Sequence, residues 1–442
     1  MPFSVLKNIP RVFLLLLVFN FSAPIFASVI WTNPPSQPLT AKRIALLPGS
    51  QQPEWEKYLQ NSERQKQADQ KFLQKEMREH GITNSIVPPE SRGVKSIPLD
   101  AREGWYRGAE ARRIADIVIS FQTPAGGWSK NLDLSKHVRT PGEQFAPDNN
   151  SVYLSNGDFD VAPAWDYVGT FDNDATISEM RFLAKVISEN PADKNESYRA
   201  SFLRGLDYIF AAQYPDGGWP QVWPLQGGYH DGVTFNDDAM CNILQLLQGI
   251  ATNQDGFAFV PKNYREHAVQ SLSRGIDCVL ATQIIVNGQR TVWCQQYDPL
   301  TLKPTSARNY EMPSEASSES AKLMQFLMSL PEPDSNVVVA VDGAAAWFEK
   351  TAIRDRAFKY YKSEGRRLIA APGKGPIWPR YCEIGTDQPI FGDRDKTIHD
   401  NLDDISKERR DGYAWFNDNP KRMLEHYRNW KKHLAKAKAH GV

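Results

Sequence analysis

Two short blocks of oxygen-bearing side chains are the first residues in this sequence that could do chemistry. Residues 170–176 read TFDNDAT and residues 234–240 read TFNDDAM, 64 residues further along the chain. Each block precedes an apolar run with helical spacing, so an Asp or Asn within it could cap a helix. Capping requires one such residue per helix and does not explain three in a row, twice. Converging carboxylate and amide oxygens would instead suit a hard cation such as calcium.

A second set of candidates is basic. Arg308 lies in ARNYE (307–311), Arg380 in WPRY (378–381) and Arg394 in FGDRD (391–395). A single Arg is more often a surface residue or an ion-pair partner. Three arginines beside Trp, Tyr and Gly indicate a site for an acidic ligand, because guanidinium pairs bidentately with carboxylate.

Several tryptophans could stack on flat ligand faces such as sugar rings. Core packing is the simpler explanation for at least half of them, because Trp carries a large apolar surface. The tryptophans concerned are Trp128, Trp219, Trp223, Trp293 and Trp378.

The elements that position these residues form a repeat. Residues 111–122, 206–213 and 276–283 are apolar segments with helical spacing, and each ends in Gln and runs towards a Trp. The first two pass through Gly-Gly turns, where glycine can adopt the left-handed conformation that ends a helix. The third turn, before Trp293, is degenerate. Arg308 follows this third unit, where the earlier units carry their acidic blocks.

These units predict an all-α fold. Each one is a helical hairpin with the acidic block at the start of its second helix, and strand signals are scarce. Stacked hairpins over residues 101–442 predict an α/α toroid, or incomplete α/α barrel. If rotation relates the hairpins, both acidic blocks face the same rim.

The N-terminal region differs from the rest. Residues 1–27 carry Lys7 and Arg11 before an apolar run at 12–21, the pattern of a secretory signal peptide. The run is short for a membrane span, which needs about 20 residues, although an N-terminal anchor is the alternative. Residues 28–100 predict a linker and one polar helix over 54–80, a leader without chemistry of its own. The expected location is secreted or periplasmic, without membrane attachment after cleavage.

Composition narrows the range of partners. The 442 residues carry a formal net charge of zero, and no basic excess points to nucleic acid. We expect a monomer. The four cysteines show no metal-binding spacing, and the sequence leaves open whether they pair as disulfides or remain buried thiols; they are Cys241, Cys278, Cys294 and Cys382.

Six segments taken in order resemble the family-ten pectate lyases over residues 100–420. They are GGWSKN from residue 126, the two acidic blocks, GGWPQVWPL from residue 217, ARNYEMPS from residue 307 and FGDRD from residue 391. The resemblance implies an α/α toroid that cleaves polygalacturonate by calcium-dependent anti β-elimination, leaving 4,5-unsaturated oligogalacturonates. Met312, the Glu315-Ala316 pair and Asp174 depart from the family pattern, and these departures affect the metal-binding part of the motifs rather than the reaction.

The resemblance also assigns roles to residues. Arg308 matches the catalytic base, while Arg380 and Arg394 match the groups that bind substrate carboxylates. Lys130, Trp128 and Trp219 are further substrate-binding candidates. The calcium-side candidates are Asp172, Asn173, Asp237 and Asp238. As a base, Arg308 must lose its proton, which nearby positive charge from calcium, Arg380 or Lys130 would favour, together with alkaline pH.

Other functions remain open at this point. An α/α-barrel glycoside hydrolase would need an acid and a base carboxylate, which Asp174 and Asp238 could supply. An isoprenoid-type cyclase would also carry acid-rich metal motifs, but the export signal and the arginines argue against it. A periplasmic oligogalacturonate-binding protein would bind the same ligand without turnover.

Overall fold

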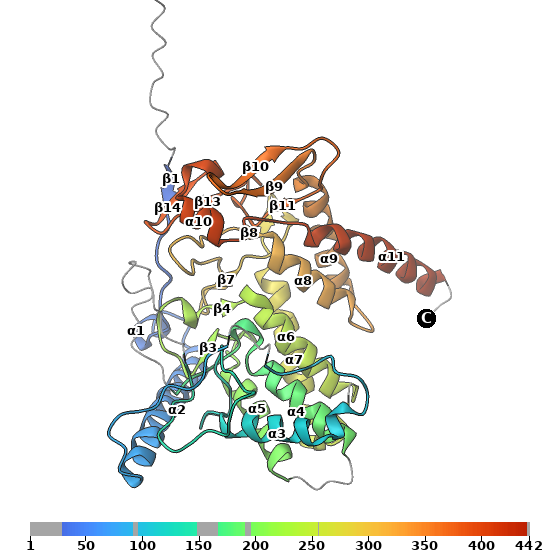
Figure 1. Ribbon diagram of the computed structural model, residues 1–442. Helices are drawn as coiled ribbons and strands as arrows, with labels where there is room; N and C mark the ends of the chain where they lie inside the picture. The colour runs from blue at the N-terminus through green and yellow to red at the C-terminus, as the bar shows by residue number, and fades with distance from the viewer. Residues whose placement is uncertain (1–28, 92–95, 148–166, 191–195, 255, 440–442) are drawn as a thin grey trace, which may run out of the picture.

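The computed structural model describes residues 29–91, 96–147, 167–190, 196–254 and 256–439. The predicted signal peptide, residues 1–27, lies outside these residues. Figure 1 shows the described chain as an arc of helices that runs from α3 and α4 at one end to α9 and α11 at the other. No helix in the described ranges is long and apolar enough to cross a membrane.

Four units in the described residues, each of two helices joined by a long loop and called a hairpin here, form the arc. Their first helices are α3 (Ala109–Ser120), α5 (Glu196–Ala212), α7 (Lys262–Thr282) and α9 (Ser335–Thr351). Their second helices are α4 (Ile177–Glu189), α6 (Ala239–Ala251), α8 (Ser317–Met328) and α11 (Asn419–Ala439), and these pack against one another in that order. The predicted all-α fold, an incomplete α/α toroid, is confirmed. The fourth hairpin was not predicted.

The repeated Gln and Trp explain why each hairpin turns in the same way. Nε2 of Gln122 donates to the carbonyl oxygens of Gly126, in its own turn, and Ser201, on the next hairpin, at 2.7 and 2.8 Å. Gln213 and Gln283 repeat this double contact. Each Trp indole N–H then donates to a carbonyl of the preceding helix, from Trp128, Trp219, Trp293 and Trp378. We call each turn from the Gln to the Trp a clasp, because its hydrogen bonds close one hairpin and hold the next one against it.

Glycine is required inside two of these clasps. Gly126 and Gly217 have φ angles of 106° and 93°, in the left-handed region. A Cβ atom would lie 2.4 Å from the Arg204 carbonyl oxygen at the first position and 2.1 Å from that of Arg274 at the second. Both distances are shorter than any tolerated contact, so only glycine allows adjacent hairpins to approach this closely.

Short antiparallel strands link each hairpin to the next. The pairs that join successive hairpins are β2 (Gly169–Thr170) with β3 (Val222–Trp223), β4 (Val233–Thr234) with β7 (Gln296–Tyr297), and β8 (Glu315–Ala316) with β12 (Tyr381–Cys382), whereas β11 (Trp378–Pro379) pairs with β15 (Phe416–Asn417) within the fourth hairpin. Hairpins β5 (Ile285–Val286) with β6 (Gln289–Arg290), and β9 (Arg356–Tyr361) with β10 (Gly365–Ala370), lie within the turns of the third and fourth units. Short helical turns complete the described chain: η1 (Trp105–Arg107), η4 (Gly228–Asp231), η6 (Leu402–Asp404) and α10 (Lys407–Gly412).

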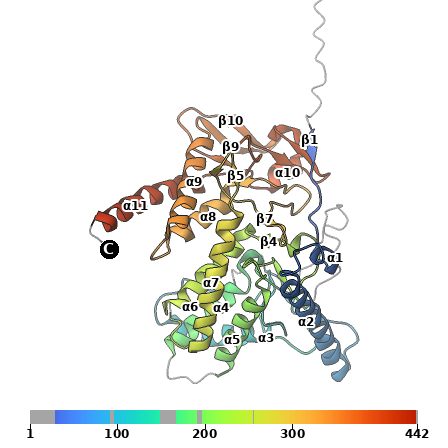
Figure 2. The same cartoon turned by 180° about the vertical axis from the view of Figure 1, so that it is seen from behind.

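The N-terminal leader binds along the arc. Helix α2 (Gln52–Glu79) is the predicted polar helix, and it follows the short α1 (Ala41–Ile44). One face of α2 is buried, where Tyr58 donates its hydroxyl to the Ala212 carbonyl at 3.0 Å, at the end of α5. Figure 2 shows α2 beside this part of the arc. Strand β1 (Val29–Thr32) pairs with β14 (Thr397–His399), which also pairs with β13 (Phe391–Gly392).

The four cysteines are all buried and free, so the thiol alternative holds and no disulfide is formed.

Candidate active site

The two acidic blocks form 3-10 turns that pack against each other. They are η3 (Asp172–Asp174) and η5 (Asn236–Asp238). The residues at the N-caps of α4 and α6, Thr176 and Asp238, make no side-chain capping hydrogen bond. Capping therefore does not explain the blocks.

Both blocks hold strained backbone. Asn173, Asp174 and Thr176 have φ angles of 51°, 63° and 67°, and Asp237 and Asp238 have 49° and 59°. Such conformations cost on the order of 1–3 kcal/mol each and persist where the surrounding structure imposes them. The strained backbone therefore lowers the stability of the folded protein, and the surrounding structure holds the side chains of both blocks in place.

The charges within the blocks are strongly coupled. Nζ of Lys130 donates to Oδ2 of Asp172 at 2.6 Å, and Nδ2 of Asn236 donates to Oδ2 of Asp237 at 3.0 Å. Burial works against the ionised form of Asp172, but the Lys130 charge outweighs it and holds the pKa of Asp172 well below its usual range. Asp237 keeps contact with solvent, yet partial desolvation and the neighbouring Asp172 charge raise its pKa. Two carboxylates this close favour an additional cation between them.

A repeated position two residues after each clasp Trp places four polar side chains beside the blocks. These side chains are Lys130, Gln221, Gln295 and Arg380. The backbone carbonyls of Gln221 and Gln295 accept hydrogen bonds from the N–H groups of Phe171 and Phe235, each one residue before η3 or η5. Each block is thus held by the next hairpin. We did not single out the two glutamines from the sequence, although aligning the repeats on Trp would have found them.

The block position of the third hairpin is held by the same backbone hydrogen bond, but the residue that accepts it is an arginine instead of a glutamine. The Arg380 carbonyl accepts from the N–H of Ser317, so Ser317 takes the place of Phe171 and Phe235, and residues 318–320 take the place of the acidic turns. Arg308 lies nine residues before Ser317, so the expectation that it occupies the register of the blocks is wrong. Glu319 is buried, and its carboxylate pairs with Nη2 of Arg380 at 2.5 Å. The same nitrogen lies 3.3 Å from Oδ1 of Asn236, which joins this pair to the second block.

Arg308 reaches the blocks from the loop between β7 and β8. Its Nε and Nη2 donate to the Glu311 carboxylate at 2.8 and 2.5 Å, and the Tyr413 hydroxyl donates to the same carboxylate at 2.7 Å. Burial alone would lower the pKa of Arg308, but the Glu311 charge raises it well above its usual value. Among the described side chains, Glu311 rather than a neighbouring cation dominates the pKa of Arg308, and the expected effect of calcium stays a prediction. The arginine in turn holds the pKa of Glu311 at about 2, against the opposing effect of burial.

Arg394 also lies beside Tyr310. Its guanidinium pairs with Glu408 at 3.1 Å and lies 5.5 Å from the Tyr310 ring centre. Arg308 and Arg409 lie 5.0 and 4.4 Å from the same ring. The structure therefore gathers Arg394 with Arg308 around one aromatic ring, while Arg380 lies over Tyr413 at 4.7 Å.

Comparison with known proteins shows the family to which this chain belongs. The family model described as pectic acid lyase matches residues 122–424. The chain belongs to the pectic acid lyase family. A family 10 polysaccharide lyase from Cellvibrio cellulosa is 29% identical, with a TM-score of 0.63 over 77% of this chain and 99% of that one. A mutant of a family 10 lyase from the same organism, in complex with trigalacturonic acid, is 30% identical, with a TM-score of 0.62 over 75% and 98%. A comparison with curated proteins finds no match.

The tryptophans belong to the core of this pectate lyase. Trp128 and Trp219 are 0% and 1% exposed, and their indole N–H groups donate to helix carbonyls. Neither offers a ring face to a sugar, so we correct the expectation that they bind substrate and assign both to the clasps.

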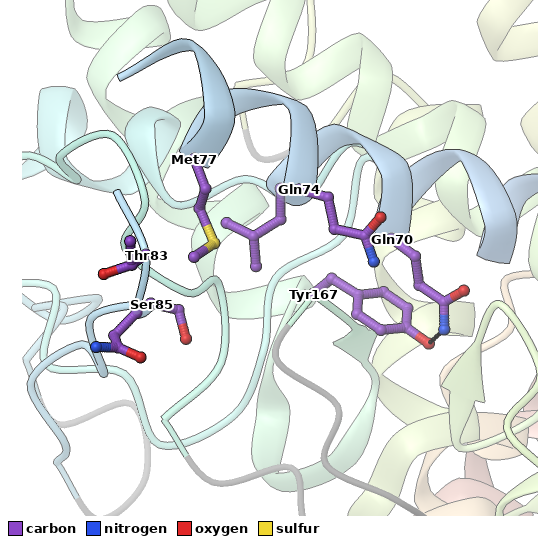
Figure 3. A pocket seen from close by; sticks show the side chains of 8 residues that line it. Gln70, Gln74, Met77, Thr83, Ser85 and Tyr167 are labelled. Atoms are coloured by element: carbon purple, nitrogen blue, oxygen red, sulfur yellow. Dashed lines mark hydrogen bonds between the residues drawn. The ribbon is translucent and has the colours of Figure 1, made fainter. Parts of the chain in front are cut away.

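A pocket elsewhere in the lyase lacks the charges for an acidic substrate. It measures about 650 Å³ and lies beside α2 (Figure 3), lined by the uncharged residues Gln70, Leu73, Gln74, Met77, Thr83, Asn84, Ser85 and Tyr167. A uronate carboxylate needs a cation or an arginine. The blocks and arginines, rather than this pocket, are therefore the candidate active site.

The residues of the blocks suit calcium by their chemistry. In the described part of the chain, no three His, Cys, Asp or Glu side chains converge as a ready metal cluster. Instead, two carboxylates meet beside amide side chains, and Oδ1 of Asp172 is buried without a hydrogen-bond partner among the described residues. Oxygen donors with few protein carboxylates leave coordination positions for water and for substrate oxygens, as a hard cation accepts.

Proposed function

We propose that this pectate lyase cleaves α-1,4-linked polygalacturonate by calcium-dependent β-elimination and releases 4,5-unsaturated oligogalacturonates. The observation that carries the proposal is the contact between η3 and η5. These turns bring two oxygen-rich blocks together in strained conformations, and their side chains cap no helix.

Asp172, Asn173, Asp237 and Asp238 are the residues that would hold the calcium ion. A calcium ion bound here would stabilise the negative charge that develops on a galacturonate carboxylate when the neighbouring C5–H bond breaks. Lys130 already neutralises one oxygen of Asp172, which limits the negative charge that the substrate must approach.

Lys130, Arg380 and Arg394 would bind and orient the substrate carboxylates. The Lys130 and Arg380 side chains are 28% and 14% exposed, so each keeps contact with solvent while paired with an acid. The trigalacturonic acid complex of the Cellvibrio cellulosa lyase mutant supports an oligogalacturonate ligand.

Arg308 is the proposed base that removes the C5 proton. Glu311 engages its Nε and Nη2, which leaves Nη1 as the nitrogen that Glu311 does not bind. The electron pair of the C5–H bond then forms the C4–C5 double bond as the C4–O bond breaks. Glu311 opposes loss of the proton from Arg308, so turnover should increase as pH rises into the alkaline range.

The rival functions have less support. The carboxylate pair named for the hydrolase alternative, Asp174 and Asp238, is engaged elsewhere, because Asp174 accepts a hydrogen bond from Asn242 at 2.6 Å and Asp238 pairs with Lys322 at 3.4 Å. Membership of a lyase family also argues against the cyclase and the non-catalytic binding protein.

Incubation of the purified protein with polygalacturonate tests the proposal. We expect ultraviolet absorbance from unsaturated chain ends, which chelator abolishes and added calcium restores. New reducing ends without ultraviolet absorbance would indicate hydrolysis. Full activity in excess chelator would remove calcium from the mechanism.

We also propose that the lyase is exported after cleavage of residues 1–27 and acts as a monomer. The basic and apolar pattern of the signal segment supports export. N-terminal sequencing of the exported protein, with light scattering to measure its mass, tests both points.

A further inference from the structure

One residue of the N-terminal leader lies inside the loop that carries Arg308. Asn33 directly follows β1 and is 1% exposed. Its Nδ2 lies 3.3, 2.9 and 3.2 Å from the backbone carbonyl oxygens of Arg308, Asn309 and Glu311, to which it donates. Its Oδ1 accepts from the Ser306 hydroxyl at 2.6 Å. A single side chain thus holds both members of the Arg308–Glu311 pair by their backbone.

The same leader segment reaches the loop of Arg394. The backbone N–H of Asn33 donates to the Lys396 carbonyl at 2.8 Å, which extends the pairing of β1 with β14. Nδ2 of Asn309 donates to the Arg394 carbonyl at 2.6 Å. Asn33 therefore lies where the two arginine loops meet.

These contacts matter for the direction of the Arg308 side chain. The loop from 306 to 311 makes few regular backbone hydrogen bonds; the two within it are Ala307 N–H to the Glu311 carbonyl and Glu311 N–H to the Arg308 carbonyl. A loop held this lightly can shift unless other groups fix its carbonyls. Buried carbonyl oxygens without a donor would also turn towards water.

We propose that Asn33 is a positioning residue for Arg308, so that the N-terminal leader forms part of the catalytic apparatus. The proposal rests on the proposed role of Arg308 as the base. The match to the family model begins at residue 122, well after Asn33. The leader, which we expected to have no chemistry of its own, thus contributes to the site by orientation.

The test compares Asn33→Ala with a control of matched type in the same leader. Tyr58→Phe also removes a buried hydrogen bond that joins the leader to the arc, but at α5 rather than at the Arg308 loop. We expect both variants to lose thermal stability. Asn33→Ala alone should lose kcat, by about 10- to 100-fold, with KM for oligogalacturonate nearly unchanged, because small misplacements of a catalytic group cost about that much. Equal kcat values for the two variants would overturn the proposal.

A double-mutant cycle ties the effect to Arg308. In an Arg308→Ala background, Asn33→Ala should cause little further loss, since the group that it positions is already gone. The same fold loss in both backgrounds would contradict the proposal. Near-normal kcat for Arg308→Ala alone would refute the base assignment itself, and that result is seen without any Asn33 variant.

If Asn33→Ala does not fold, Ser306→Ala provides the second route. It removes the hydrogen bond that orients the Asn33 amide and leaves Asn33 in place. A smaller loss of kcat in the same direction is expected, and an unchanged kcat would overturn the proposal.

Discussion

A buried carboxyl group on α4 should make the lyase less stable as pH rises. Glu179 is 1% exposed, and burial raises its pKa to about 8, with Asp174 adding to the shift and the backbone N–H groups of Glu179 and Thr176 opposing it. The folded protein keeps this proton up to about pH 8, whereas the unfolded chain releases it near its ordinary pKa of 4.5. Stability therefore falls between these two values as pH rises, and the loss is complete above the higher one.

The size of the effect follows from the two pKa values. Each pKa unit corresponds to about 1.4 kcal/mol, so the raised pKa of Glu179 lowers the free energy of unfolding by about 5 kcal/mol at pH 9 and about 2 kcal/mol at pH 6. Glu179→Gln keeps the shape and an acceptor oxygen and removes the titration. The free energy of unfolding of the variant should exceed that of the wild type by about 3 kcal/mol more at pH 9 than at pH 6.

Urea unfolding followed by circular dichroism at both pH values measures this difference. Glu79→Gln is the control, because the Glu79 side chain is 58% exposed at the end of α2. This substitution replaces the same carboxylate by the same amide at a site that is not buried. If Glu179→Gln changes stability equally at both pH values, Glu179 does not titrate between them and the reasoning fails.

Three further outcomes test the site. Asp172→Ala and Asp237→Ala should raise the calcium concentration needed for turnover and keep the helical signal, since neither side chain caps a helix; loss of that signal would contradict this. Arg308→Ala should lower kcat by on the order of 10²–10⁴ at saturating substrate, whereas Arg394→Ala should mainly raise KM, and the reverse pattern would exchange their roles. Glu311→Gln should shift the rise of kcat with pH to lower pH and lower its alkaline plateau, because Arg308 loses both a negative neighbour and an orienting carboxylate; parallel profiles would contradict this.

The fold was predictable where the sequence repeats its turn chemistry. The Gln, Gly and Trp of the first two clasps predict helical hairpins directly, and the third hairpin is recognisable from its Gln and Trp. The fourth hairpin escaped because the β9–β10 hairpin lies between α9 and Trp378, which hides the spacing, although the Trp378 indole makes the same bond to the preceding helix.

The site was predictable only in part. The sequence picked out Asp172, Asp237 and Lys130, which the fold brings together. The hydrogen-bond partners of the site residues were harder to predict. Tyr413, 102 residues from the Glu311 carboxylate to which it donates, becomes its neighbour only through tertiary packing. Trp residues in a motif also looked like ligand contacts, because sequence alone does not distinguish a buried ring from an exposed one.

The pairing of β1 with β14 has a consequence for how the enzyme comes into being. It joins the first described strand to one near the C-terminal end of the chain, and Asn33 bonds to a residue 276 positions away. Contacts this distant in sequence form late, since a long loop must close before they are made. The helices can therefore assemble before the loops that carry Arg308 and Arg394 are fixed in place. The enzyme would then pass through a folded stage that has no activity. Its activity would arise only once the segment around β14 has been synthesised and has bound the leader.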